Sequence, residues 1–429
     1  MEEQYFIDEK KGISGDALLS AVKNTVSQYP HAKKVLIIPP DYTRCFSFAG
    51  EITGHLYRLF REMGAQVDVM PALGTHVPMS EEEREVFFRG EVPPDAILVH
   101  NWQTDCHTLG NIPAWLLEEI SQGQYAAQVP VQVDYRFVEN GYDVIFCPGQ
   151  VVPHEAAGMA GYSKSLFIGI GGKEMINQSH MLSAVCDCEK AMGVMNSPLR
   201  RMFDYAQERF IDGKFPVVYL QTVVTMKGQK ACLNGLFIGS SRKPYEKACE
   251  LSIRLNINHL NKPAKKVVAY ADPEEMHSLW ISNKAIYRTR MAIADGGELL
   301  VIAPGVEKAG ESPDVDRAVR RFGYRGRKKI LEWYHQGLFE GDVLTAGCLM
   351  LGSSDGRFRI TYATRPENMA RQEIESLGFA WMDCEEALEK YNPDHLKEGF
   401  NTMPEGEEVY FVGKPALGLW KYEKGEEGS

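Results

Sequence analysis

Three short β-branched runs in the first third of the chain, each followed by a polar turn and a helical pattern, constrain the fold most strongly. The runs occupy residues 35–38, 67–70 and 144–147. After the second run, Ser80 and Glu83 form a capping-box pattern, which predicts that a helix begins there. Strands that alternate with helices predict an α/β domain built on a mostly parallel sheet.

Each run leads into a turn that carries ionisable side chains. Asp41 and Arg44 follow the first run, His76 follows the second, and His154 follows the third. Ligands of α/β sheets bind outside the carboxyl ends of the strands. A single histidine in such a turn is more often an ordinary loop residue, but three strand ends with polar chemistry indicate a functional site.

A polar, proline-containing stretch at residues 261–266 has the composition of a linker, and a second set of strand patterns follows it. These patterns lie at residues 267–270, 298–303, 359–362 and 409–412. A helix is expected from Glu274 to about Ala294, ending at Asp295-Gly296-Gly297 as its C-cap.

We therefore expect two α/β domains, each with a mostly parallel sheet flanked by helices and with the active site in the cleft between them. The N-terminal domain is predicted over residues 1–263 and the smaller C-terminal domain over residues 264–413. For the tail, residues 414–429, a return to the first domain stays open.

Composition narrows the classes of protein. The 429 residues include 47 Lys and Arg against 58 Asp and Glu, a net charge of −11, which disfavours binding to nucleic-acid phosphates. The chain has no apolar run of membrane-spanning length, and its first residues, MEEQYFIDEKKG, lack a secretory apolar segment. The nine cysteines are scattered apart from Cys186 and Cys188, which indicates reduced thiols and a cytoplasmic location without a membrane partner.

Two familiar motifs fit poorly. The glycine-rich segment 169–173 ends in Gly-Lys, but Phe167 stands where a phosphate loop needs glycine, and Glu174 replaces the Ser or Thr that would hold magnesium. His100 and His107 flank Asp105 and Cys106 in a weak, ligand-like cluster that is more typical of a polar loop than of a zinc site.

The segment 153–182 is the most informative. It contains His154, then Lys164 ten residues later, and His180 sixteen residues after that. Taken alone, Lys164 could be a solvated surface lysine and His180 a helix histidine without a chemical role.

This spacing occurs together with D-Y-T-R at 41–44, G-T-H at 74–76 and S-N-K-A at 282–285, in that order. The combination resembles the nickel-pincer lactate racemases and their relatives, and the resemblance extends over most of the chain. Four elements in the same order are much more specific than any one of them.

The resemblance implies a cofactor, pyridinium-3,5-bisthiocarboxylic acid mononucleotide, tethered to Lys164 through a thioamide and holding nickel. His180 is then the protein ligand of the nickel, and Asp41 and Thr43 belong to the cofactor-binding residues of the N-terminal domain. Sulfur donors with imidazole suit Ni(II) in a planar arrangement. The implied partners are the maturation enzymes that carboxylate the cofactor precursor, transfer sulfur and insert nickel.

The implied activity is that of an isomerase that inverts the α-hydroxy carbon of a 2-hydroxy acid through a 2-oxo acid intermediate. A hydride moves from Cα to the cofactor and returns on the other face, so each enantiomer needs its own acid/base group. His76 and His154 match this pair, Arg44 and Lys284 match the carboxylate-binding cations, and Asp41 orients its neighbours.

The chain departs from the family pattern in two places. In the segment before Lys164, Met159 replaces an aromatic residue, Ala160 a serine and Tyr162 a glycine. Before Lys284, Trp280 and Ile281 replace tyrosine and glutamine, which predicts a substrate larger than lactate. Trp333 is one candidate for the family's later active-site tryptophan, and we leave that role unassigned.

Two alternatives stay open. One is a family member with different chemistry, a dehydratase or hydrolase, and the other is a non-catalytic carboxylate-binding protein on the same scaffold. The presence of both His76 and His154 favours an enzyme over a binding protein, because binding a carboxylate needs cations but not two bases.

Overall fold

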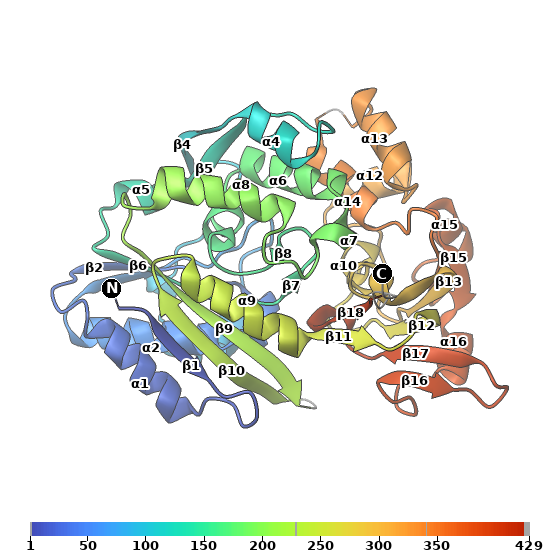
Figure 1. Cartoon of the computed structure of the whole chain (residues 1–429), viewed down its shortest axis with the longest axis horizontal. Helices are drawn as coiled ribbons and strands as arrows, with labels where there is room; N and C mark the ends of the chain where they lie inside the picture. The colour runs from blue at the N-terminus through green and yellow to red at the C-terminus, as the bar shows by residue number, and fades with distance from the viewer. Residues whose placement is uncertain (1, 228–229, 340, 424–429) are drawn as a thin grey trace, which may run out of the picture. The chain divides into compact units, whose positions relative to one another are not determined.

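The structure is a computed structural model that describes residues 2–227, 230–339 and 341–423. The chain forms two compact units, each of which contains helices and a six-stranded sheet (Figure 1). One unit extends to Ser179 and resumes over Ala191–Leu255, and the other comprises His180–Lys190 and the described chain from Asn256 onward. The prediction of two α/β domains is confirmed.

In the sheet of the first unit, four adjacent strands are parallel, and two antiparallel strands extend the sheet at one side. Its strands are, in spatial order, β1 (Gln4–Ile7), β10 (Lys230–Gly239), β9 (Val217–Lys227), β6 (Val144–Gln150), β2 (Lys34–Ile37) and β3 (Gln66–Val69). The pairs β9–β6, β6–β2 and β2–β3 are parallel, whereas β1 and β10 are antiparallel to their neighbours. The three β-branched runs of the sequence are thus adjacent parallel strands.

Helices α1 (Gly15–Val26), α2 (Ala49–Glu62) and α3 (Glu81–Phe88) belong to the same hydrophobic core as this sheet. Phe60 of α2 packs on Phe146 of β6 with ring centroids 5.5 Å apart. Ser80 caps α3 in a capping box with Glu83, so the predicted start of this helix is confirmed. The core holds the carboxyl ends of β2, β3 and β6 at one edge of the sheet.

The other elements of the first unit are shorter. Two strand pairs are β4 (Cys106–Ile112) with β5 (Val129–Asp134) and β7 (Pro153–His154) with β8 (Gly158–Met159). The helices are α4 (Ala114–Ile120), α5 (Tyr135–Glu139), α8 (Pro198–Ala206) and α9 (Lys243–Asn256). Helix α6 (Lys173–Val185) begins in this unit and ends in the second unit.

The sheet of the second unit is also mostly parallel. Its strands are, in spatial order, β15 (Ala380–Asp383), β14 (Arg359–Thr364), β13 (Ile293–Ile302), β12 (Ala264–Tyr270), β17 (Glu408–Val412) and β16 (Gly399–Thr402). Only β16 is antiparallel to its neighbour. A separate parallel pair joins β11 (Ile257–Leu260) to β18 (Leu419–Tyr422), and residues 424–429 of the tail lie outside the described residues.

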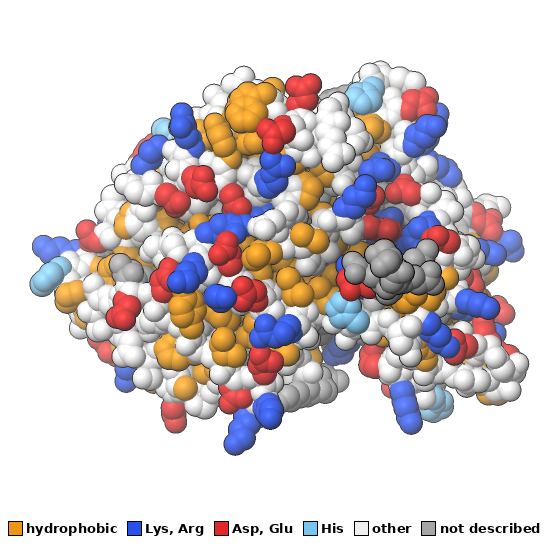
Figure 2. Space-filling view, in the orientation of Figure 1, with side chains coloured by type: hydrophobic (Ala, Val, Ile, Leu, Met, Phe, Trp, Pro, Cys, Tyr) orange, Lys and Arg blue, Asp and Glu red, His pale blue; other side chains and the backbone are white. Residues whose placement is uncertain are grey.

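The helices of the second unit lie mainly between its strands in sequence. They are α7 (Cys188–Ala191), α10 (Leu279–Ser282), α11 (Lys284–Thr289), α12 (Pro313–Phe322), α13 (Arg327–His335), α14 (Val343–Leu351), α15 (Arg371–Ser376) and α16 (Cys384–Lys390). Within the described part of the chain, no helix combines the length and apolar character that crossing a bilayer requires. Figure 2 shows acidic and basic side chains interspersed over the visible surface.

The expected helix over residues 274–294 is wrong. Ser278 has extended backbone angles (φ −132°, ψ 157°) and caps α10 through Oγ, so no helix passes through it. The predicted C-cap at Asp295-Gly296-Gly297 lies inside β13, where the Gly296 amide donates to the Arg357 carbonyl at 2.8 Å. Gly296, whose backbone is left-handed (φ 73°), therefore lies within an irregular part of β13 and does not end a helix.

Candidate active site

Asp41 and His76 form a dyad at the carboxyl edge of the first sheet. Strands β2 and β3 pair in parallel, and a further bridge joins Pro40 to Ala72, so the two following loops start side by side. The Oδ2 atom of Asp41 lies 2.5 Å from Nδ1 of His76. The Asp41 side chain is 8% exposed and that of His76 is 52% exposed, so the carboxylate is buried behind an accessible imidazole.

The electrostatics of this dyad determine where the imidazole carries its proton. Burial alone raises the pKa of Asp41, but the hydrogen bond and charge of His76, with Thr43 and Arg44, hold that pKa below its ordinary value. Thr43 donates to Oδ1 of Asp41 from both its amide (3.2 Å) and its hydroxyl (2.5 Å). An ionised Asp41 accepts a hydrogen bond from His76 only if Nδ1 is protonated, which leaves Nε2 as the basic nitrogen.

His154, which follows β6, has the opposite arrangement. Its Nδ1 accepts hydrogen bonds from the backbone amides of Ala156 (3.1 Å) and Ala157 (3.2 Å). Its Nε2 lies 3.9 Å from Oε1 of Glu155. Because a nitrogen that accepts cannot carry a proton, neutral His154 holds its proton on Nε2, where it can donate a hydrogen bond.

We expect these two tautomers to be visible by NMR. In long-range 1H–15N spectra of histidine-labelled protein at neutral pH, neutral His76 should show a protonated Nδ1 and neutral His154 a protonated Nε2. Single replacements by asparagine assign the signals, and Asp41→Asn should weaken the Nδ1 preference of His76 only. The same tautomer at both histidines would contradict this interpretation.

Lys164 lies at the start of a π-helical turn, Ser165–Gly169, and is half-buried. Removal from water lowers the pKa of its amine to about 8; Arg44 and Arg200 act in the same direction, whereas Glu155 and Asp41 oppose it. At pH 7 roughly one amine in ten is then unprotonated, a far larger share than for an ordinary lysine. Lys164 is thus suited to act as a nucleophile or covalent anchor.

The unusual residues before Lys164 have a structural explanation. Tyr162 has a left-handed backbone (φ 55°) at the position where the family pattern has glycine. Its ring packs on Tyr219 and Tyr245 at centroid distances of 4.5 and 5.3 Å, and its amide donates to Oε1 of Gln221 at 2.7 Å. These contacts offset the cost of a left-handed tyrosine, which is ordinarily unfavourable.

The second unit carries the other predicted site residues. His180 lies half-buried on α6, Trp280 and Ile281 lie half-buried on α10, and Lys284 begins α11 and is also half-buried. Their neighbour Leu279 is fully buried, so Leu279 rather than Trp280 is the core residue of α10. Trp333 is on α13 and its ring packs near Phe322.

Three residues near the site have no obvious sequence signal. Glu155 lies near His154, Gln221 holds the Tyr162 amide, and Arg200 is a fully buried arginine of α8. Each one reads as an ordinary polar residue of a turn, a strand or a helix. Gln221 and Arg200 reach the segment around Lys164 only through the tertiary structure.

The weak His100–His107 cluster is not a metal site in this structure. The buried His100 bonds to Oδ2 of Asp134 (2.8 Å) and to the Gly171 carbonyl (3.0 Å), whereas His107 faces Glu139 at 3.6 Å. Among the described residues, no group of three or more His, Cys, Asp or Glu side chains could hold a metal ion. A metal bound by this part of the chain would therefore need donors other than these side chains.

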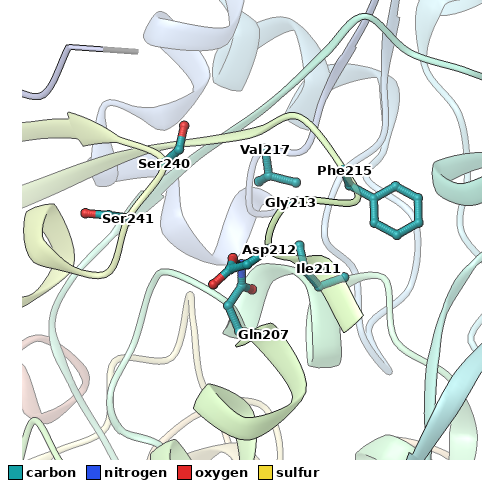
Figure 3. A pocket seen from close by; sticks show the side chains of 8 residues that line it. All are labelled: Gln207, Ile211, Asp212, Gly213, Phe215, Val217, Ser240 and Ser241. Carbon is teal, nitrogen blue, oxygen red and sulfur yellow. The ribbon is translucent and has the colours of Figure 1, made fainter. Parts of the chain in front are cut away.

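A small pocket of about 320 Å³, with a mixed polar and apolar lining, lies elsewhere in the first unit (Figure 3). It is lined by Gln207, Ile211, Asp212, Gly213, Phe215, Val217, Ser240 and Ser241. Val217 begins β9, which is parallel to β6, so the pocket is at the amino edge of the sheet. The candidate catalytic residues follow the carboxyl ends, and the pocket is separate from them.

The fold and site define an α/β protein that places two histidines and a lysine of lowered pKa after the strands of a parallel sheet. Residues 10–193 match the family described as the lactate racemase N-terminal domain. The chain is 24% identical over 325 residues to lactate racemase of Thermoanaerobacterium thermosaccharolyticum, which covers 71% of this chain and 70% of that protein. Both matches support a relationship to the lactate racemase family, and the family model covers the N-terminal part of the chain.

Solved structures show the same fold. A crystal structure of a protein from Thermotoga maritima superposes with a TM-score of 0.81 at 22% identity, covering 96% of this chain and 100% of that one. The lactate racemase apoprotein from T. thermosaccharolyticum superposes with a TM-score of 0.70 at 18% identity, covering 96% of this chain and 94% of that one. These likenesses extend through both units.

Proposed function

We propose that this protein is a racemase or epimerase that inverts the α-hydroxy carbon of a 2-hydroxy acid. The observation that carries the proposal is that His76, backed by the buried carboxylate of Asp41, and His154 follow the carboxyl ends of two strands of one parallel sheet. Two such imidazoles supply the one acid/base group per enantiomer that an inversion requires. The similarity to the lactate racemase family supports the same conclusion.

The cofactor we propose is a nickel pincer nucleotide, pyridinium-3,5-bisthiocarboxylic acid mononucleotide, linked to Lys164, with His180 as the protein ligand of nickel. One observation supports the fit: the Lys164 side chain is half-buried and its amine has a pKa of about 8, which suits a covalent link. A site of this kind would draw most of its nickel donors from the cofactor.

When bound, this cofactor would supply an acceptor for the hydrogen on the substrate Cα. His76 removes the hydroxyl proton through Nε2, and the ionised Asp41 stabilises the imidazolium that results. His154 serves the other enantiomer. Arg44 binds the substrate carboxylate, and Lys284 is proposed as a second cation for it. The proposed protein partners of this chain are the enzymes that build the cofactor and insert nickel.

Maturation of the chain with nickel and the cofactor-building enzymes tests this proposal. We expect a mass adduct on the Lys164 peptide, bound nickel, deuterium exchange at C2 and loss of optical purity with a panel of 2-hydroxy acids. Lys164→Arg should abolish the adduct, and His180→Ala should keep the adduct but retain less nickel.

The outcomes separate the alternatives. A dehydratase or hydrolase would give a product of changed mass instead of an inverted one, and a carboxylate-binding protein would give neither exchange nor product. Absence of any adduct on Lys164 in nickel-loaded, active protein would refute the cofactor assignment.

A further inference from the structure

Residues 157–164, here called the lysine loop, are hydrogen-bonded to α8. The backbone carbonyl of every second residue in the first part of this loop accepts a hydrogen bond from a side chain of α8 or of its N-cap residue. These carbonyls belong to Ala157, Met159 and Gly161. Ser197, which caps α8, donates to the first carbonyl at 2.8 Å, and Nη2 of Arg200 donates to the other two at 2.9 and 3.3 Å. The start of one helix therefore holds the loop along most of its length.

Arg200 also binds the loop residue next to Lys164. Its Nη1 donates to the Ser163 hydroxyl at 3.0 Å, so a single guanidinium spans three residues of the loop. The Tyr245 hydroxyl adds a bond to the Met159 carbonyl at 3.2 Å. The lysine loop thus has a fixed backbone path up to the residue that carries the amine.

The surroundings of Arg200 are unusual for a buried cation. Its side chain is fully buried, and no carboxylate of the described residues forms an ion pair with it. Its guanidinium carbon lies over the Tyr245 ring at 4.5 Å and over the Phe203 ring at 5.7 Å from the centroids. Burying a charge without a carboxylate is costly, even with carbonyl dipoles and aromatic faces around it. A helix that only needed to pack here could use an apolar residue.

Two glycines allow the lysine loop to pack closely against neighbouring segments of the first unit. A Cβ atom on Gly158 would lie 2.2 Å from the Val194 carbonyl oxygen, and one on Gly161 would lie 2.3 Å from Oε1 of Gln221. Both glycines have left-handed backbones, with φ of 73° and 89°. The glycines therefore allow the backbone path of the lysine loop that the buried guanidinium of Arg200 stabilises.

We infer that Arg200 is a positioning residue that fixes the lysine loop and so presents the Lys164 amine for attachment of the cofactor. The inference rests on the proposed function for the identity of the attached group but not for the geometry. The charged groups that influence the Lys164 amine are Arg44, Glu155, Asp41 and Arg200, and the pKa of the amine is lowered by burial first, then by Arg44, with a smaller contribution from Arg200.

The test uses the full chain without cofactor and acetic anhydride as a probe of the amine. The extent of Lys164 acetylation is measured by peptide mass spectrometry as a function of pH, and amide hydrogen exchange is measured over the lysine loop. Arg200→Met removes the charge and the donors, Arg200→Lys keeps the charge but loses the planar fork, and Arg201→Met is the matched control. Arg201 is the next residue of α8 and pairs with Glu119 at 2.7 Å.

In Arg200→Met we expect amide exchange in the loop to accelerate, with a smaller rise of the acetylation midpoint above about 8, because burial and Arg44 lower the pKa of the Lys164 amine more than Arg200 does. Arg200→Lys should restore most of the midpoint but not the slow exchange, a separation that a purely packing role would not produce. Arg201→Met should change neither.

An unchanged midpoint and unchanged exchange in a folded Arg200→Met chain would overturn the inference. If circular dichroism shows that this variant does not fold, Arg200→Lys decides: wild-type exchange in the lysine loop would overturn the inference, and faster exchange supports it. Because the probe needs no cofactor, the inference can hold even if the matured protein carries no adduct and the proposed function fails.

Discussion

Replacement of either His76 or His154 by alanine should lower racemisation in both directions by about 10²–10⁴-fold, the usual contribution of general acid–base catalysis. In the proposed mechanism, every complete inversion uses one histidine to remove the hydroxyl proton and the other to return a proton on the opposite side. The expected measurement is the loss of optical rotation from each pure enantiomer, with nickel content and the Lys164 adduct determined in parallel. The nickel content and the Lys164 adduct should stay at wild-type levels in both variants.

The exposed His107→Ala is the matched control, because His107 is 45% exposed and faces Glu139 instead of the Asp41–His76 dyad. It should retain full activity. Asp41→Asn should lower the rate less than His76→Ala does, because it removes the partner of the imidazole and not the base itself. Near wild-type racemisation by either alanine variant would refute the two-base assignment.

The substrate preference should favour a 2-hydroxy acid or sugar acid larger than lactate, by about 10–200-fold in kcat/KM, the range of one good pocket contact. Trp280 and Ile281 stand where the lactate racemase pattern has polar-tipped residues, and both are half-buried rather than sealed in the core. Trp offers a broad apolar face and one donor, and Ile offers no hydrogen bond. Competition assays across a panel of side-chain sizes measure the preference.

Trp280→Tyr combined with Ile281→Gln should shift this preference back toward lactate. Trp115→Tyr is the matched control, because Trp115 is 57% exposed on α4, and it should leave the preference unchanged. If lactate proves the best substrate of the unmodified chain, the pocket role of these two residues is refuted, while the histidine and lysine assignments are unaffected.

The parts of the fold that follow local rules could be predicted from the sequence. The three β-branched runs are strands, and Ser80 caps a helix, because both depend on residues close in the chain. The convergence of Asp41 and His76 follows from general strand rules once β2 and β3 are neighbours. The roles of Lys164 and His180 came from the resemblance to a family and not from local pattern.

What could not be predicted depends on tertiary contacts. The helix expected over residues 274–294 is interrupted because Ser278 is extended and β13 begins earlier than its apolar core suggests. The tautomer of His154 depends on where two backbone amides point, and the role of Arg200 depends on the carbonyls of a distant loop. The periodicity of the sequence shows neither the direction of a backbone amide nor the contacts between distant segments.

The loop that carries His76 is held at two points just before the histidine. It starts from the bridge between Pro40 and Ala72, and the Gly74 amide donates to the Gly169 carbonyl at 2.8 Å, which ties it to the turn after Lys164. An inserted or deleted residue here would displace the imidazole relative to Asp41. We therefore expect the site to tolerate exchanged side chains around the substrate better than a change in the length of this loop.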